Sequence, residues 1–131
     1  MNPLTLEWIE KAEKDYGTAS REFRVKISAN YDGVCFHCQQ CAEKYVKGFL
    51  QEQVISFGKT HNLVHLLDLV VPSKPAWEIH RQELHVLSGF AVQLRYPGDS
   101  ADKSMAKESL RFCRIFRKFV RGELGLLRRK K

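Results

Sequence analysis

Apolar residues recur every three or four positions along most of the chain, and no window shows the sustained alternation of a β-strand. This period predicts a first helix over about residues 5–23, with Thr5 as its N-cap. A turn signal at residues 30–33 (Asn-Tyr-Asp-Gly) precedes a second helix over about residues 32–53. Both segments are amphipathic, so we expect each to bury one face against the rest of the fold.

Two shorter helices are predicted in the middle of the chain. Gly58 interrupts the helical pattern, and Thr60 is expected to cap a third helix that ends at Pro72. A fourth helix begins at Ser73 and Pro75 and continues to about residue 94.

A fifth helix is predicted from about residues 99–102 to about residue 127, after a break at Pro97 and Gly98. At 100° per residue its apolar and basic residues separate onto opposite arcs. The apolar arc consists of Phe112, Cys113, Phe116, Phe119 and Val120, and the basic arc consists of Arg111, Arg114, Arg117, Lys118 and Arg121. The pattern as a whole predicts an all-α protein.

The length of the chain is that of one domain. A fold of 131 residues buries roughly two-thirds of its unfolded surface, which is enough for one core, so we expect a single domain over residues 1–131. No apolar run approaches the ~20 residues that cross a bilayer, and the N-terminus lacks the basic start and apolar core of a signal peptide. These features favour a cytoplasmic protein that does not associate with membranes.

Positive charge is concentrated at the C-terminal end. Residues 1–102 carry 11 Lys/Arg and 13 Asp/Glu, whereas residues 103–131 carry 11 Lys/Arg and two Glu, so the two parts have formal charges of −2 and +9. Two interpretations remain open. The charge is either a solvated helix face with a basic tail over about residues 125–131, or a surface that attracts phosphates or an acidic partner.

Cysteine and histidine spacings raise the question of a metal site. Cys35, Cys38 and Cys41 form a C-x2-C-x2-C pattern, but the segment lacks the Gly or Pro of a turn, and on a straight helix Cys41 points away from Cys35. We expect these thiols to pack as small apolar side chains. His61 and His65 have a ligand-like spacing without an obvious third ligand. No metal or cofactor is predicted.

Two polar groups are candidates for binding. Gln40, Glu43, Lys44 and Lys47 recur at i, i+3, i+4 and i+7 and form one stripe, in which Glu43 and Lys47 can pair. Taken alone, such a stripe is typical of a solvent-facing, salt-bridged surface. The second group, Arg95-Tyr96-Pro97, ends the fourth helix, where the forked guanidinium either interacts with the helix dipole or recognises a phosphate.

These segments together resemble the HEPN family (higher eukaryotes and prokaryotes nucleotide-binding domain). The similarity rests on CFHCQQCAEKYVKGFL at 35–50, KTHNLVHLL at 59–67 and LRYP at 94–97, before a last amphipathic helix. It implies an up-and-down bundle of four to five helices, commonly a homodimer, and many members are encoded beside a minimal nucleotidyltransferase in toxin–antitoxin systems. The ligand-binding candidates are Arg95, Tyr96, Gln40, Glu43, Lys44, Lys47 and His61.

The chain departs from the catalytic motif of the family. Several HEPN branches are metal-independent ribonucleases with an R-x4-6-H motif, in which Arg stabilises charge on the phosphate and His assists proton transfer. With Arg95 as the arginine, the histidine would fall at positions occupied by Ser100, Ala101 and Asp102. We therefore hypothesise that the chain is not an efficient ribonuclease by this mechanism.

Three functions follow from these observations. The favoured one is a HEPN module that binds a nucleotide or phosphate and partners a separately encoded minimal nucleotidyltransferase in a toxin–antitoxin-type pair. The alternatives are a ribonuclease toxin with an atypical site and a nucleic-acid-binding protein that contacts RNA through the basic arc of the last helix. We also expect a homodimer, for which Phe57, Phe90 and Tyr96 lie near element ends and could remain exposed.

Overall fold

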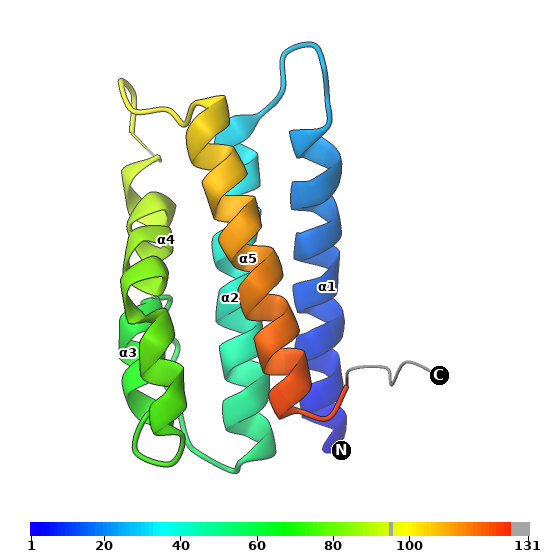
Figure 1. The fold of residues 1–131 in the computed structure, drawn as a ribbon, viewed down its shortest axis with the longest axis vertical. Coiled ribbons are helices and arrows are strands. Elements are labelled where there is room, and N and C mark those ends of the chain that lie inside the picture. Colours follow the sequence, from blue (N-terminus) through cyan, green and yellow to red (C-terminus); the bar gives the residue numbers. More distant parts are fainter. Residues whose placement is uncertain (95, 127–131) are drawn as a thin grey trace.

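The computed structural model describes residues 1–94 and 96–126, and they form a bundle of helices (Figure 1). Four longer helices run up and down. They are α1 (Pro3–Phe23), α2 (Tyr31–Glu52), α4 (Arg81–Gln93) and α5 (Lys103–Glu123). The short helix α3 (Leu63–Val70) and the 3₁₀ helix η1 (Pro75–His80) follow α2 in the chain. The predicted all-α up-and-down bundle is confirmed. In the described residues, no helix combines the length and apolar character needed to cross a membrane.

The N-caps of α1 and α3 differ from the predicted ones. Asn2, not Thr5, caps α1 through its side-chain oxygen, which accepts a hydrogen bond from the amide of Leu4. Thr5 is buried one turn inside the helix. In the same way Asn62 caps α3, and the Thr60 hydroxyl accepts from the Asn62 amide. Both predictions were wrong because asparagine is the stronger cap residue, and an asparagine stands two or three positions from each predicted threonine.

The predicted fourth and fifth helices also differ in their bounds. The segment that begins at Pro75 is a 3₁₀ turn, and regular α-helix starts at Arg81. The last helix ends at Glu123 rather than near residue 127. Gly125 has a φ of 73°, and the amide of Leu126 donates to the carbonyl of Arg121. A left-handed glycine with this hydrogen bond is a common way to end a helix.

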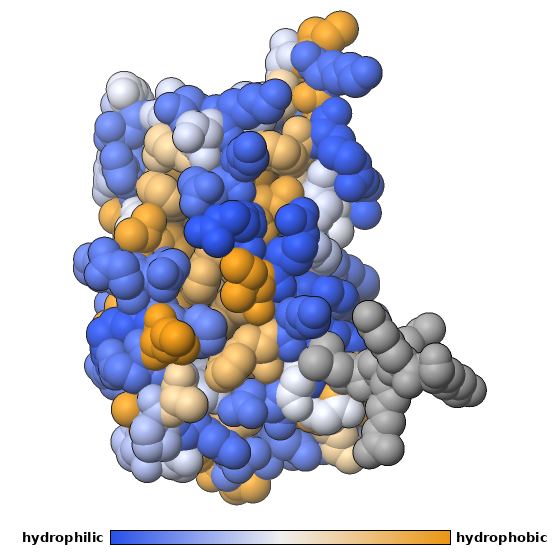
Figure 2. All heavy atoms as spheres, viewed as in Figure 1, coloured by the Kyte–Doolittle hydropathy of each residue, from blue (hydrophilic) through white to orange (hydrophobic). Residues whose placement is uncertain are grey.

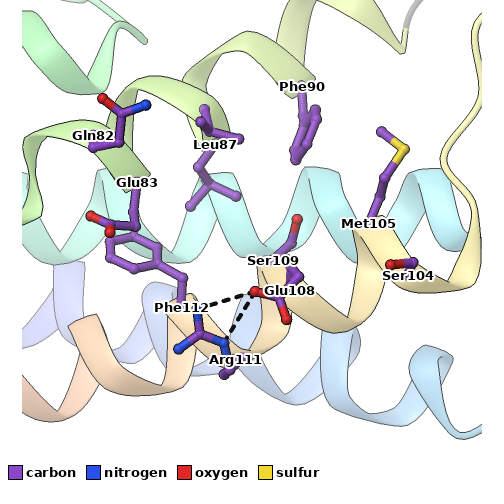
Figure 3. A pocket seen from close by; sticks show the side chains of 11 residues that line it. Gln82, Glu83, Leu87, Phe90, Ser104, Met105, Glu108, Ser109, Arg111 and Phe112 are labelled. Carbon is purple, nitrogen blue, oxygen red and sulfur yellow. Dashed lines mark hydrogen bonds and ion pairs between the residues drawn. The ribbon is translucent and has the colours of Figure 1, made fainter.

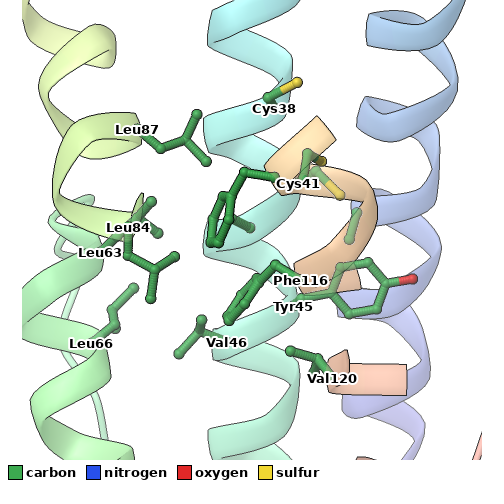
Figure 4. Packing of buried hydrophobic residues seen from close by; sticks show 14 of the residues in the cluster. Cys38, Cys41, Tyr45, Val46, Leu63, Leu66, Leu84, Leu87, Phe116 and Val120 are labelled. Atoms are coloured by element: carbon green, nitrogen blue, oxygen red, sulfur yellow. The ribbon is translucent and has the colours of Figure 1, made fainter. Parts of the chain in front are cut away.

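The hydrophobic core is built around α2, which contacts all the other α-helices. Figure 4 shows α2 side chains lying between those of α3 and α4 on one side and α5 on the other. All four cysteines are free and buried, which confirms that they pack as small apolar residues. Burial raises the pKa of the Cys35 and Cys41 thiols, so both stay protonated at neutral pH.

Candidate functional site

A buried carboxylate in the middle of α2 organises the candidate site. Glu43 accepts hydrogen bonds from Lys47 Nζ at 2.9 Å, from Gln39 Nε2 at 3.0 Å and from His61 Nδ1 at 3.1 Å. Gln39 is fully buried and also donates to the backbone carbonyl of His61 at 3.1 Å. Because a carboxylate only accepts, His61 carries its proton on Nδ1 and its Nε2 is left for a ligand. The network therefore ties the α2–α3 connection to the centre of α2.

The burial of this network differs from the solvent-facing stripe that the sequence suggested. The side chains of Glu43 and Lys47 are 4% and 6% exposed. They are covered because α1 lies close to α2 here, where Gly48 has no side chain and a Cβ would come within 3.3 Å of the Trp8 Cβ. The Trp8 ring then lies over Lys47, with 5.6 Å between the ring centroid and Nζ. The i,i+4 pair is thus an internal ion pair.

Beside the network is a surface cavity of about 470 Å³, lined by Trp8, Lys47, Phe57, Gly58, Lys59 and His61. We call it the Trp8 cavity. The rings of Trp8 and Phe57 meet edge to face with centroids 6.1 Å apart. The side chain of His61 is 73% exposed, so it is open to solvent on the side away from Glu43. Aromatic faces are suited to stacking a base, and the ammonium groups next to them are suited to binding a phosphate.

Gln40 and Lys44, the other two residues of the predicted stripe, do not line this cavity. Lys44 Nζ lies 2.5 Å from one oxygen of Asp15 on α1, and the other oxygen lies 2.7 Å from His37 Nδ1. Gln40 donates to the Gln39 side chain at 2.7 Å. Lys44 and His37 thus join α2 to Asp15 of α1, whereas Gln40 bonds within α2. Within the described part of the chain, no three Asp, Glu, His or Cys side chains are arranged to hold a metal ion.

Of the predicted Arg95-Tyr96-Pro97 group, Tyr96 lies away from the Trp8 cavity. Arg95 is outside the described residues. Tyr96 is 61% exposed in the α4–α5 connection, which is held at the start of α2 by a 2.6 Å hydrogen bond from the Ala101 amide to Asp32 (Figure 1). Glu43 follows Asp32 by eleven residues, or about 16 Å along α2. Tyr96 and the Glu43 network therefore do not belong to one site.

The basic arc of α5 is less exposed than its pattern suggested. Arg117 makes a two-pronged contact with Glu13 at 2.5 and 2.6 Å and lies 4.6 Å from the Tyr16 ring centroid. Arg121 donates to the Tyr45 hydroxyl at 3.2 Å. Burial alone would raise the pKa of Glu13, but hydrogen bonds from Arg117 and Tyr45 outweigh it and lower the pKa. The expectation that Arg117 and Arg121 face solvent was wrong, because α1 packs beside them and supplies their partner.

Three residues of the Trp8 cavity were not among the predicted ligand candidates. Trp8 lies at the helical spacing of apolar residues in α1, which is typical of a core-facing position. Phe57 was considered as an interface aromatic. Lys59 precedes His61 by two residues, and this proximity was the available signal for it. The aromatic part of the cavity depends on α1 approaching the α2–α3 connection, which no local pattern reveals.

Comparisons with known proteins agree with this architecture. The model of the HEPN domain matches residues 5–123. The crystal structure of an archaeal HEPN homologue is similar with a TM-score of 0.74 and 29% sequence identity, covering 92% of this chain and 97% of that chain. No curated protein matches the sequence significantly. The family match includes all five α-helices and the Glu43 network, and the chain therefore belongs to the HEPN domain family.

Proposed function

We propose that this HEPN protein binds a nucleotide in the Trp8 cavity and does not transform it. The observation that carries the proposal is the meeting of two aromatic rings with Lys47, Lys59 and His61 around about 470 Å³ of open space. That volume is within the range of about 300–1,000 Å³ typical of small-molecule sites. A base can stack on Trp8, the phosphate can accept a hydrogen bond from Lys59, and His61 Nε2 can accept one from a ribose hydroxyl.

The α4–α5 connection supports a non-catalytic role. The positions where the ribonuclease motif has its histidine are Ser100, Ala101 and Asp102. Two of them hold the connection in place: the Ala101 amide donates to Asp32 at 2.6 Å, and Asp102 caps α5 by accepting from the Met105 amide at 2.8 Å. An imidazole is thus missing where the family mechanism requires a proton carrier.

Ligand binding is tested by isothermal titration and thermal shift with AMP, ATP and UTP. We expect one of them to bind and, at about 100 times its Kd, to stabilise the protein by about 2.7 kcal/mol. Lys59→Gln and Trp8→Leu should each weaken binding by about tenfold or more, since each removes a phosphate or a base contact.

Matched substitutions outside the cavity serve as controls. Lys14→Gln removes an exposed lysine of α1, and Phe36→Leu removes an exposed aromatic of α2. Both should leave the affinity unchanged. Absence of binding by all three nucleotides, or equal loss in cavity and control variants, would contradict the proposal.

Membership of the family supports a second part of the proposal, that the protein acts as a homodimer and as the partner of a separately encoded minimal nucleotidyltransferase in a toxin–antitoxin-type pair. An apolar cavity of about 330 Å³ between α4 and α5 is suited to the dimer contact (Figure 3). Leu87, Phe90, Met105 and Phe112 line it, and Val86 beside them is 46% exposed. A second copy of the chain would remove this apolar surface from water.

Light scattering should therefore give a mass close to twice 15.2 kDa, and Val86→Arg should produce a monomer because it places a charge in the apolar contact. Ile79→Arg, at a position 77% exposed in η1, should remain dimeric. A wild-type monomer at high concentration would exclude the dimer.

Co-purification with a nucleotidyltransferase encoded next to the gene would support the proposed pairing, and a gene without such a neighbour would count against it.

A further inference from the structure

Four cations lie in one row along α5. Lys103, Lys107, Arg114 and Lys118 are at i, i+4, i+11 and i+15, so they share an arc of about 60° and extend over about 22 Å of the helix. In residues 1–94 and 96–126 none of the four forms an ion pair, whereas the other arginines of α5 pair with carboxylates. Arg114 donates to the Tyr16 hydroxyl at 3.2 Å, which orients its guanidinium without neutralising it. We call these residues the α5 row.

The row ends at a second surface cavity, of about 490 Å³, lined by Phe23, Arg24, Val25, Lys26, Tyr31 and Lys103. It lies where the α1–α2 connection passes close to the beginning of α5, at one end of the bundle (Figure 1). The rings of Phe23 and Tyr31 lie at 6.4 Å between centroids with a tilt of 56°. Two further cations, Arg24 and Lys26, therefore flank a pair of aromatic rings at the end of the row.

The carboxylates near this end are already engaged by the backbone. Glu22 accepts a hydrogen bond from the Asn30 amide at 2.9 Å, and Asp32 accepts from the Ala101 amide at 2.6 Å. Asp102 accepts from the Met105 amide as the cap of α5. In the described residues none of these carboxylates forms an ion pair with the cations of the row or the cavity, so those cations remain available to an external partner.

We propose that the α5 row and the Phe23–Tyr31 cavity bind single-stranded nucleic acid, with successive phosphates along α5 and one base stacked at Phe23 and Tyr31. The charges are ordered in a line and end at aromatic rings, which is the combination that proteins use for unpaired strands. A duplex keeps its bases stacked and offers none to these rings. Figure 2 shows hydrophilic and apolar side chains mixed along α5, and Ile115 is 48% exposed, so the test must distinguish nucleic acid from an acidic protein partner.

This surface is separate from the Trp8 cavity, since Phe23 follows Trp8 by fifteen residues, or about 22 Å along α1. The two sites therefore make independent predictions. The Lys59→Gln variant should bind nucleic acid like the wild type, and variants of the α5 row should bind mononucleotides like the wild type.

The test is fluorescence anisotropy with labelled RNA and DNA oligomers of about 16 uridines or thymidines, over a range of salt concentrations. A triple variant, Lys107→Gln with Arg114→Gln and Lys118→Gln, removes three phosphate contacts. The slope of log K against log salt should become shallower by about 2, and affinity at about 50 mM salt should fall by roughly two orders of magnitude. Tyr31→Leu should weaken binding by about tenfold without changing the slope, because stacking releases no counterions.

A control triple, Lys14→Gln with Lys74→Gln and Arg81→Gln, removes the same net charge from other surfaces, and Phe36→Leu removes an exposed aromatic elsewhere on α2. Both should retain the wild-type slope and affinity within about twofold. Circular dichroism melting of each variant verifies folding. Equal effects of the two triples, absence of binding to either oligomer, or stronger binding to oligoglutamate than to RNA and DNA would overturn the proposal.

Discussion

Replacing Glu43 by alanine should lower the free energy of unfolding by about 3–5 kcal/mol, the usual cost of removing one partner from a buried ion pair. Lys47 is 5% exposed and would be left buried without its partner. Gln39, which is fully buried, would lose an acceptor, and His61 would lose the contact that holds the α2–α3 connection. The loss is large because these groups are buried, so water cannot replace the carboxylate.

Urea unfolding followed by circular dichroism measures this effect. The matched control is Glu10→Ala, which breaks the i,i+4 pair with Lys14 on the surface of α1, where the two side chains are 71% and 76% exposed. It should cost less than about 0.5 kcal/mol. In the double variant Glu43→Leu with Lys47→Met, much of the stability should return, since neither charge is then buried alone. A Glu43→Ala variant as stable as the Glu10→Ala variant would show that the pair is open to water.

The second large effect is expected at Trp77, the fully buried residue of η1. Its ring lies 4.5 Å from the Phe49 ring and 5.3 Å from the Phe119 ring, and its Nε1 donates to Glu123 at 2.8 Å. Trp77 thus joins the connection between α3 and α4 to both α2 and α5. Trp77→Ala should destabilise the protein by about 3–5 kcal/mol, because it leaves a cavity among aromatic rings and an unpaired polar contact.

Thermal and urea unfolding of Trp77→Ala should show a lower midpoint and an unchanged urea dependence of the unfolding free energy. Ile79→Ala is the control in the same short helix, at a position 77% exposed, and should change stability by less than about 0.5 kcal/mol. Trp77→Phe keeps an aromatic ring and loses the hydrogen bond to Glu123. Its free energy of unfolding should therefore lie between those of Trp77→Ala and Ile79→Ala. Stability close to wild type in Trp77→Ala would mean that η1 does not contribute to the core.

The ligand candidates predicted from the sequence include Glu43, Lys47 and His61, which the structure brings together at or beside the Trp8 cavity. Tyr96 lies at another end of the bundle, and Lys44 is bound to Asp15. Sequence spacing placed the α2 residues correctly because a helix determines the relative positions of its own side chains. It did not show which parts of the stripe are buried, because burial depends on the elements that pack against α2.

The sequence by itself determined the helices and the elements of the charge pattern. Apolar spacing, prolines and glycines act through neighbouring residues, so most helices were predicted within a few residues of their ends, and α4, which begins at Arg81 rather than near Pro75, is the exception. The i,i+4 pairing of Glu43 with Lys47 was also predictable from the sequence.

The tertiary structure decided which of these groups are free to bind. Arg117 takes Glu13 as its partner from 104 positions away, and the Trp8 cavity forms because Gly48 lets α1 approach α2. Contacts of this kind depend on how helices distant in the chain pack together, and local sequence patterns do not predict them.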